Sequence, residues 1–209
     1  MQSHVNKERD TRLSKKLSYL LRHGALREGL SIKSDGFVKV EEILKNKLSG
    51  YSQKDVERVV ANDEKQRYSL AKNNGILEIR ANQGHSISNI CDLTLKAVPE
   101  DPDFEIIHGT YLEHWPEIRS KGLSRMKRNH IHFAKGLNFI CGLRKSAELY
   151  IYINFKEARE AGLKFLESEN GVILCSGDDR GIIETRYFSK VTTRNGESLP
   201  EESQDSSCL

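Results

Sequence analysis

The chain has few of the residues that mark secreted, membrane-spanning or zinc-dependent proteins. Its 209 residues include four cysteines, which are widely spaced and form no Cys-x-x-Cys pair, so a disulfide framework and a structural metal are not expected. No apolar run approaches the ~18 residues of a membrane span, and the first residues lack the apolar segment of a signal peptide. These absences predict a cytoplasmic protein, with a nuclear location left open.

Negative charge is missing from one long segment. Between Ile118 and Ala147 there is no Asp or Glu, whereas eight Lys or Arg residues fall there. At the C-terminus, residues 195–209 carry four acids and no base. The whole chain has a formal charge of +3 and this tail −4, so residues 1–194 carry +7. The basic segment predicts an anionic partner, most simply phosphate or nucleic acid.

The N-terminal part, residues 1–85, predicts three helices and a hairpin. Leucines from Leu13 to Leu21 recur with helical spacing, a second helix is expected over 38–44, and Ser52 with Asp55 predicts a capped third. The Asn73-Asn74-Gly75 turn separates two β-type runs. This order is typical of a winged helix, although a generic α+β subdomain without a nucleic-acid role explains it equally well.

The remainder reads as a linker followed by a β-rich unit. Residues 86–103 are polar and contain two prolines, which suits a linker, and a helix is expected from Tyr111 to Gly122. The tail 195–209 is expected to be disordered. The predicted class is therefore α+β, with a second domain over 104–194 whose strands are expected at 104–108, 130–134, 148–154, 171–175 and 186–193.

Several polar residues lie where they could bind an anion. Arg22 and His23 end the first helix beside its buried stripe, although complementing the helix dipole is an equally good explanation. Arg67 opens a hairpin strand, where arginines usually face solvent. His108-Gly109-Thr110 joins a strand to a helix, and a glycine there permits a ligand to approach, although an ordinary strand end explains it more simply.

The most basic stretch contains a His-x-His pair. If residues 128–134 are extended, Arg128, His130 and His132 share one face. No Cys, Asp or Glu lies near enough in sequence to complete a metal site, and the surrounding cations oppose a divalent ion. Anion binding is therefore favoured over metal binding, and no metal is expected.

Five segments, taken in order, resemble the RNA 2′-phosphotransferase family, best known as tRNA 2′-phosphotransferases. The similarity extends from about Leu13 to Tyr187, and its separations make chance co-occurrence improbable. The segments are "LSKKLSYLLRHGAL" with the following "GL" and "DGFVKV" (13–40), "KQRYSL" (65–70), "IRANQGHS" (79–86), "HGTYLEHWPEIRSKGLSRMKRNHIHFA" (108–134) and "GVILCSGDDRGI" (171–182).

The resemblance implies an N-terminal winged-helix lobe and a C-terminal ADP-ribosyltransferase-like lobe that binds NAD. It also implies a reaction on RNA that carries an internal 2′-phosphate left by splicing. The phosphate attacks C1″ of the nicotinamide ribose and expels nicotinamide. The ribose 2″-hydroxyl then attacks phosphorus, which releases 2′-OH RNA and ADP-ribose 1″,2″-cyclic phosphate.

Residues are assigned by their match to the family motifs. The resemblance implies catalytic roles for Arg22, His23, Arg67 and Arg128, and NAD contacts for His108, Gly109, Thr110, His132 and Arg144. The "IRANQGHS" loop is expected on the substrate side, through Arg80, Gln83, His85 and Ser86. One departure is Cys141, which stands where the family tends to have serine and hydrogen-bonds more weakly. His130 receives no role.

Elementary chemistry supports these assignments. The 2′-phosphate is already anionic, so the first step needs positioning and no general base. Arginines match phosphate oxygens and stay charged, and His23 is the candidate for protonating the departing RNA oxygen, a role worth ~10²–10⁴ in rate.

Two other classes fit part of the pattern. One is an ADP-ribosyltransferase that stops at the RNA adduct, and the other is a non-catalytic winged-helix nucleic-acid binder, which leaves the β-rich unit unexplained. The expected partner is 2′-phosphorylated RNA, with tRNA as the family's usual substrate, and the expected oligomeric state is a monomer. Because contacts to phosphates do not read base identity, the residues do not indicate which RNA is bound.

Overall fold

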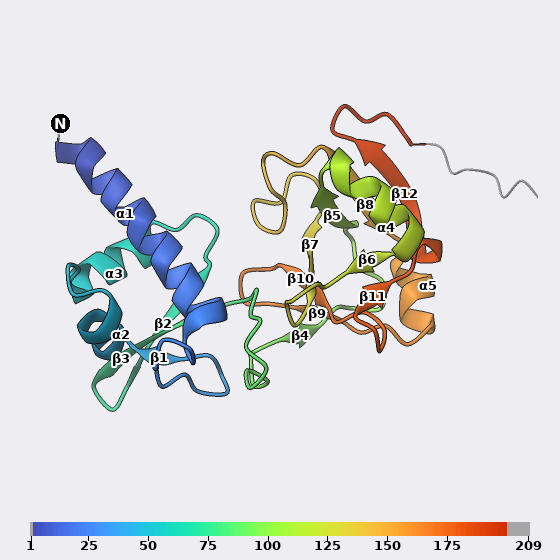
Figure 1. Cartoon of the computed structure of the whole chain (residues 1–209). Coiled ribbons are helices and arrows are strands. Elements are labelled where there is room, and N and C mark those ends of the chain that lie inside the picture. The colour runs from blue at the N-terminus through green and yellow to red at the C-terminus, as the bar shows by residue number, and fades with distance from the viewer. Residues whose placement is uncertain (1, 200–209) are drawn as a thin grey trace, which may run out of the picture.

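The buried apolar residues form two large clusters that follow each other along the chain. The computed structural model describes residues 2–199. One cluster contains residues from Leu13 to Ile90 and the other from Val98 to Tyr187. Figure 1 shows the corresponding two parts side by side, in blue to green and in green to red. We call them the N-terminal lobe and the C-terminal lobe.

The N-terminal lobe is built from helices that cover a small sheet. Helix α1 (Gln2–Tyr19) continues into a π-helical turn, η1 (Leu20–Gly24), and buries Leu13, Leu17 and Leu21 completely. Helices α2 (Val40–Lys47) and α3 (Gln53–Ala61) follow. The three helices were expected; the π-helical turn was not, and it adds a residue to the turn that carries Arg22 and His23.

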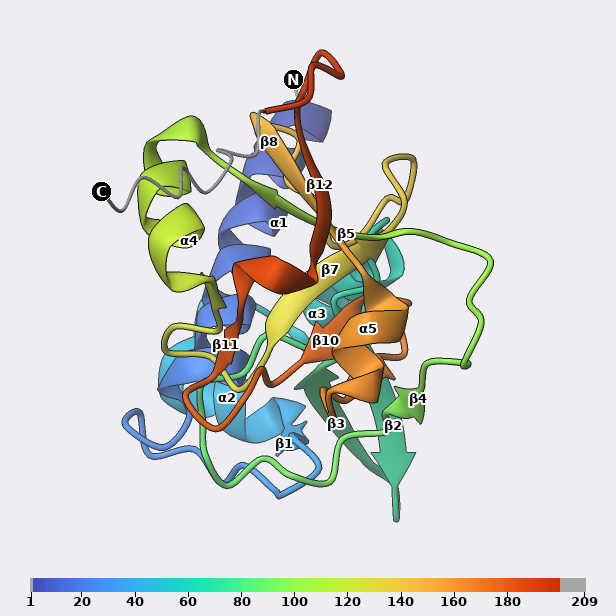
Figure 2. The same cartoon turned by 90° about the vertical axis from the view of Figure 1, so that its right-hand side faces the viewer.

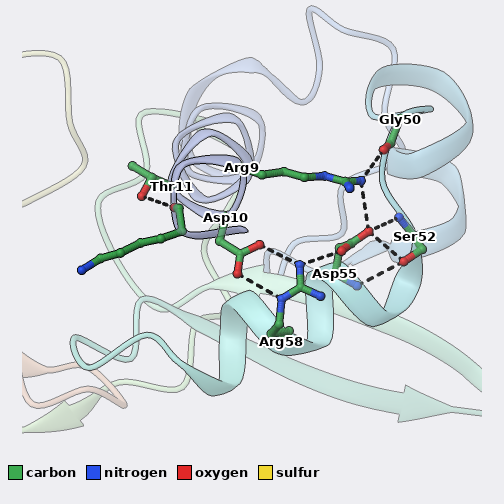
Figure 3. A network of polar contacts seen from close by, with 8 residues as sticks. Arg9, Asp10, Thr11, Gly50, Ser52, Asp55 and Arg58 are labelled. Carbon is green, nitrogen blue, oxygen red and sulfur yellow. Dashed lines mark hydrogen bonds and ion pairs between the residues drawn. The ribbon is translucent and has the colours of Figure 1, made fainter. Parts of the chain in front are cut away.

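Helix α3 begins with the capping box that its sequence predicts. The Ser52 hydroxyl accepts from the Asp55 backbone N–H, and the Asp55 carboxylate accepts from the Ser52 N–H at 2.8 Å. Arg58 donates to both Asp10 and Asp55 at 2.7 and 2.6 Å, and Arg9 donates to the Gly50 carbonyl at 2.6 Å. These bonds hold the first turns of α1 against α3 (Figure 3).

The sheet of this lobe has the strand order β1-β3-β2. The predicted hairpin is confirmed as β2 (Tyr68–Asn73) and β3 (Ile76–Ala81), with Asn74 and Gly75 at positive φ in the turn. Strand β1 (Val38–Lys39) pairs antiparallel with β3 and was not expected, because residues 38–44 read as helix alone.

The C-terminal lobe contains a seven-stranded sheet in the order β12-β8-β5-β7-β10-β9-β4. The five expected strands are present with shifted ends, as β5, β7, β8, β10 and β12. Four other short strands were not expected: β4 and β9 in the same sheet, and β6 and β11, which form a separate pair. The bounds are β4 Lys96–Ala97, β5 Ile106–Thr110, β6 Leu123–Ser124, β7 Ile131–Lys135, β8 Leu149–Ile153, β9 Phe165–Glu167, β10 Ile173–Cys175, β11 Ile182–Ile183 and β12 Phe188–Thr193.

Short helices lie around this sheet (Figure 2). The helix expected from Tyr111 to Gly122 is divided into a 3-10 turn, η2 (Leu112–His114), and α4 (Trp115–Lys121), because Pro116 occupies the first turn of α4 and begins a new helix there. Helix α5 (Phe155–Glu160) is capped by Asn154, and η3 (Thr185–Tyr187) precedes β12. The lobes together form a mixed α/β fold.

Two expected irregular segments are more ordered than their sequences suggested. Within 86–103, Ile87 and Ile90 pack into the N-terminal cluster and Val98 into the C-terminal one. Residues 195–199 turn back on β12, where Ser198 bridges Thr192. The rest of the expected disordered tail, 200–209, lies outside the described residues. None of the helices within 2–199 combines the length and apolar content that a bilayer crossing requires.

Candidate active site

The π-helical turn at the end of α1 directs Arg22 and His23 away from the buried leucines. Gly24 lies directly against the exposed Tyr19 ring: a Cβ atom on it would lie 2.6 Å from that ring, which would have to move. Gly84 has φ +90°, and a Cβ there would lie 3.3 Å from Arg22 Nε. The loop after β3 therefore packs its backbone directly against the Arg22 side chain.

His23 is held by the same loop. Its Nδ1 lies 2.9 Å from the Ser86 hydroxyl, and the Ser86 backbone N–H donates to the Arg22 carbonyl at 2.9 Å. Because Nδ1 is engaged, the opposite ring nitrogen, Nε2, is the one available for a substrate. Burial lowers the pKa of His23, and the charges of Arg128 and Arg22 lower it further.

Arg67 is oriented by the turn that precedes β2. The Asp63 carboxylate accepts from the Arg67 backbone N–H at 2.6 Å and also forms an ion pair with its guanidinium. The expected position at the start of the hairpin is confirmed. The ion pair was not expected, and it means that Arg67 is oriented by a carboxylate instead of lying free on a solvated face.

Arg128 and His130 lie in a bend just before β7. The expected extended segment 128–134 begins only at Ile131, so His132 belongs to the strand and the other two do not. Arg125 Nη1 donates to the Arg128 carbonyl at 2.8 Å and fixes the bend. The Arg128 side chain has no hydrogen-bond or ion-pair partner among the described residues, which leaves its guanidinium available to an anion.

The charges of arginines from the two lobes act on one another. Burial lowers the pKa of Arg22, and the nearby charges of Arg128 and Arg67 lower it further, whereas Tyr68 and Asp63 raise it. Arg128 is exposed overall, yet partial desolvation and Arg144 lower its pKa. The charged forms of Arg22 and Arg128 are therefore disfavoured by burial and by neighbouring cations, and an anion bound beside them would relieve that repulsion.

Several buried polar side-chain atoms have no partner within the described residues. They are the Arg22 Nε and Nη2 atoms, the Arg80 Nε atom, both ring nitrogens of His85, and the His132 Nε2 atom. Leaving a buried polar atom without a partner costs ~1–3 kcal/mol. A site that carries several such atoms is adapted to polar groups that the chain itself does not supply.

His85 is a buried histidine near this site, with 2% of its surface exposed. Burial lowers its pKa to about 4, with further contributions from Arg22, His23, His130 and Arg80. His130 lowers the pKa of both His85 and His132, so it belongs to the same cluster, although no role was predicted for it from the sequence.

The low pKa of His85 predicts a loss of stability in mild acid. Its ordinary pKa is 6.5, so between pH 6.5 and about 4 the unfolded chain binds a proton that the folded chain does not. The free energy of unfolding is expected to fall as pH falls through this window, by at most roughly 3 kcal/mol from His85. Urea unfolding of the wild type and His85→Gln at pH 7.5 and 4.5 measures this share.

His114 provides the matched control for that experiment. It is exposed on η2, so His114→Gln is expected to lose as much stability between the two pH values as the wild type does. Identical losses for His85→Gln and the wild type would contradict the prediction.

Four of the five candidate cofactor residues lie on β5 and β7, and Arg144 lies in the loop before β8. His108 Nδ1 lies 2.9 Å from the His132 carbonyl oxygen, so Nδ1 carries the proton and Nε2 is an acceptor. Burial lowers the pKa of His108 and, more strongly, of His132. Both rings are therefore neutral near pH 7.

Gly109 and Thr110 differ from what their sequence suggested. Both lie within β5, and no helix begins at Thr110, whose residue partner across the sheet is Leu149. A Cβ on Gly109 would lie 2.9 Å from Leu143 Cδ2 and 3.0 Å from the Ala147 Cβ. The chain itself therefore fills the space beside this glycine, and close packing explains its small size.

An aromatic group lies next to Arg144. The Arg144 guanidinium carbon is 5.8 Å from the centre of the Tyr111 ring, and the Tyr111 hydroxyl lies 2.9 Å from the Ser146 hydroxyl. Arg144 also lowers the pKa of Arg128 and of His108. Arg144 thus lies close to both the arginine group and the β5 histidine.

The two lobes are joined at the turn that precedes Arg67. The Lys65 carbonyl accepts from the Cys141 thiol at 3.2 Å and from Asn170 Nδ2 at 2.9 Å, and Lys65 Nζ donates to the Leu143 carbonyl at 3.2 Å. Cys141 therefore supplies one weak hydrogen bond from a buried position. These contacts connect the turn that carries Arg67 to the loop that carries Arg144.

Arg80 forms a second contact between the lobes. It is buried, donates to Glu169 at 2.6 Å and lies 4.8 Å from the Phe37 ring centre. The sequence placed Arg80 among substrate contacts, whereas the structure gives its guanidinium these internal partners. Gln83, in the same loop, is partly exposed.

A cavity of about 750 Å³ lies along the same junction. Its lining includes Asp63, Glu64 and Glu169 and none of the four predicted catalytic residues, so its charge does not suit an anion. Among the described residues no group of three or more His, Cys, Asp or Glu side chains is arranged to hold a metal ion.

The charges of this arrangement suit a phosphate-bearing anion. Arginines from both lobes converge here, and neutral histidines lie beside them where protons can be transferred. Sequence reasoning missed the lobe contacts of Lys65, Asn170 and Glu169, because no local pattern marks a contact between residues so far apart. An enzyme that transfers or removes phosphate is the class that such a site indicates.

Comparison with known proteins identifies the family. The chain belongs to the RNA 2′-phosphotransferase, Tpt1/KptA family, whose family model matches residues 8–177. It is 51% identical to tRNA 2′-phosphotransferase 1 of Danio rerio, over 87% of this chain and 85% of that protein. It is 42% identical to tRNA 2′-phosphotransferase 1 of Homo sapiens, over 88% and 76%. The tRNA 2′-phosphotransferase of Saccharomyces cerevisiae is 39% identical, over 81% and 80%.

Proposed function

We propose that the protein removes the internal 2′-phosphate from ligated RNA, as at a tRNA splice junction, with NAD as a consumed co-substrate. The reaction passes through RNA whose 2′-phosphate is ADP-ribosylated, and gives 2′-OH RNA, nicotinamide and ADP-ribose 1″,2″-cyclic phosphate. The convergence of Arg22, Arg67 and Arg128 with His23 carries this proposal. Family membership supports it through the printed names of the relatives.

We assign the two halves of the reaction to the two lobes. Residues 1–85 are proposed as a winged-helix lobe that binds the RNA phosphate, supported by three helices followed by a hairpin. Residues 104–194 are proposed as an ADP-ribosyltransferase-like lobe, with 86–103 as the connection. The contacts of Lys65 with Cys141, Leu143 and Asn170 fix the proposed RNA-phosphate site relative to the proposed NAD site.

The residues around β5 suit a dinucleotide. NAD carries a pyrophosphate, which Arg144 can neutralise, and flat rings, which an aromatic side chain such as Tyr111 can pack against. The buried His132 Nε2 atom has no partner among the described residues and is a candidate contact for a polar group of NAD. His108 and Thr110 are proposed beside it, and Gly109 contributes through packing.

In the first step, a 2′-phosphate oxygen bonds to C1″ as nicotinamide leaves with the electron pair of the broken bond. NAD supplies the electrophilic carbon. The protein needs no base here, because the attacking oxygen is already anionic, and its contribution is to hold that oxygen against C1″. Arginines on both sides of the junction can grip the phosphate and fix its direction.

In the second step, the 2″-hydroxyl oxygen bonds to phosphorus and releases its proton to solvent, while the bond from phosphorus to the RNA 2′-oxygen breaks and that oxygen takes up a proton. Arg22, Arg67 and Arg128 are proposed to stabilise the charge on the equatorial oxygens. His23 is proposed to supply the proton from Nε2, with Ser86 holding its Nδ1. Arg128 and Arg22 lower the pKa of His23, whereas a bound phosphate opposes them, so RNA binding is expected to favour its protonated form.

Two other functions are separated by one assay. The purified protein is incubated with NAD and a 2′-phosphorylated oligonucleotide, and nicotinamide and RNA products are followed together. A winged-helix binder without catalysis releases no nicotinamide, and an ADP-ribosyltransferase stops at the RNA adduct. We expect nicotinamide, a free RNA 2′-OH and the cyclic phosphate; accumulation of a stable adduct would favour the ADP-ribosyltransferase.

A further inference from the structure

Helix α1 presents two chemically different sides. At ~100° per residue, the completely buried Leu13 and Leu17 lie on one side, and Arg12, Lys15 and Tyr19 lie roughly opposite. These three side chains are exposed, and we call them the α1 stripe. Lys16 is also exposed but lies at the border of the buried side, beside Leu13. Hydrophobic packing against the lobe explains the first side and leaves the second unexplained.

The stripe is unusually free of negative charge. Residues 11–27 contain five Lys or Arg and no Asp or Glu. Asp10, at the start of this segment, is paired with Arg58 on the α3 side of the helix (Figure 3), and Glu8 lies one turn before Arg12. Within the described residues, Arg12 and Lys15 form no hydrogen bond or ion pair, and Lys16 lies 5.9 Å from the Tyr51 ring centre.

An aromatic ring continues the stripe toward the candidate active site. Tyr19 lies against Gly24, where the π-helical turn leaves room for it, and its hydroxyl accepts a hydrogen bond from Arg27. Tyr19 and His23 are four residues apart and therefore share a helix face. Surfaces that bind single-stranded nucleic acid combine cations for the backbone with aromatic rings on which bases stack.

The stripe points in the right direction to serve the site. Figure 1 shows α1 running from the far end of the N-terminal lobe toward the C-terminal lobe, so its last turn, with Arg22 and His23, faces the junction. From Arg12 to His23 the helix rises about 16 Å, the length of about five stacked nucleotides. A strand whose phosphate reaches His23 can therefore continue along Tyr19, Lys15 and Arg12.

We propose that the α1 stripe binds the RNA strand that flanks the 2′-phosphorylated nucleotide. This inference rests on the proposed function, because it takes the occupant to be the RNA substrate. The stripe contacts phosphates and a stacked base without reading sequence, so it sets affinity for longer RNA and leaves the chemistry unchanged. Substrate length is then the variable that reveals it.

The test measures the kinetics of the wild type and of the double variant Arg12→Ala/Lys15→Ala on two 2′-phosphorylated RNAs of different length. The short RNA has about one nucleotide on each side of the modified ribose and the long RNA about eight, which exceeds the length of the stripe. For the long RNA we expect KM to rise roughly ten-fold and the slope of log KM against log salt to fall by about 1 per cation removed. For the short RNA, kcat and KM are expected to match the wild type.

Lys45→Ala/Lys54→Ala is the matched control, because both lysines are exposed on the same lobe outside the stripe and their loss changes the net charge equally. If the control variant raises KM for the long RNA by the same factor, the effect comes from the overall positive field of the lobe and not from the stripe. If Arg12→Ala/Lys15→Ala leaves KM for the long RNA unchanged, the stripe does not contact the RNA. Either result overturns the inference. Loss of activity on the short RNA also overturns it. Failure of the wild type on both RNAs would instead contradict the proposed function.

Discussion

Replacement of Arg128 by alanine is expected to lower the rate of phosphate removal by about 10²–10³-fold, the scale seen when a single charge-stabilising donor is lost. The bend that carries Arg128 is held by its backbone, and its side chain has no partner among the described residues. The fold should therefore be unaffected. Single-turnover rates with NAD and 2′-phosphorylated RNA, together with thermal unfolding, measure both expectations.

Two further variants sharpen this prediction. Arg128→Lys retains the charge but loses the two parallel N–H donors that match phosphate, so partial activity is expected. Lys127→Ala removes the adjacent exposed cation and is expected to retain a rate near that of the wild type. A fully active Arg128→Ala protein would exclude Arg128 from the site.

Replacement of His23 by asparagine is expected to separate the two chemical steps. Attack on C1″ needs no proton transfer from the protein, so nicotinamide release should persist for the first turnover. The second step loses its proton donor and slows by ~10²–10⁴, so the ADP-ribosylated RNA should accumulate. Resolving RNA species on a denaturing gel against nicotinamide release follows both steps in one reaction.

The Ser86 hydroxyl provides a graded comparison for the same experiment. Its contact with His23 Nδ1 at 2.9 Å orients the ring, so Ser86→Ala should slow the second step less than His23→Asn does. Ser86→Thr retains a hydroxyl and should restore the rate. If the intermediate formed by His23→Asn turns over at the wild-type rate, His23 does not supply the proton.

Local patterns predicted the parts of the fold whose causes are local. The capping box at Ser52 and the Asn74-Gly75 turn are determined by a few neighbouring residues, and both are present as expected. The π-helical turn at Leu20–Gly24 was missed, because no local pattern in the sequence marks it. The loop at Gly84, 60 residues further along the chain, packs against Arg22 in this turn, and no local pattern predicts that contact either.

The sequence predicted which residues belong to the candidate site better than it predicted their contacts. The family motifs pointed to Arg22, Arg67 and Arg128, and in the structure the charges of Arg67 and Arg128 both act on Arg22. The sequence could not distinguish Arg80, which pairs with Glu169 across the lobes, from arginines that face a substrate. Nor could it indicate that Leu143 and Ala147 fill the space beside Gly109.

The most direct test of the account follows the fate of the phosphate itself. RNA with a ³²P-labelled internal 2′-phosphate is incubated with the protein, with and without NAD, and the labelled products are separated. The account predicts that label leaves the RNA only with NAD and appears in ADP-ribose 1″,2″-cyclic phosphate, one nicotinamide being released for each phosphate. Label released as inorganic phosphate without NAD, or retained on RNA after nicotinamide release, would contradict it.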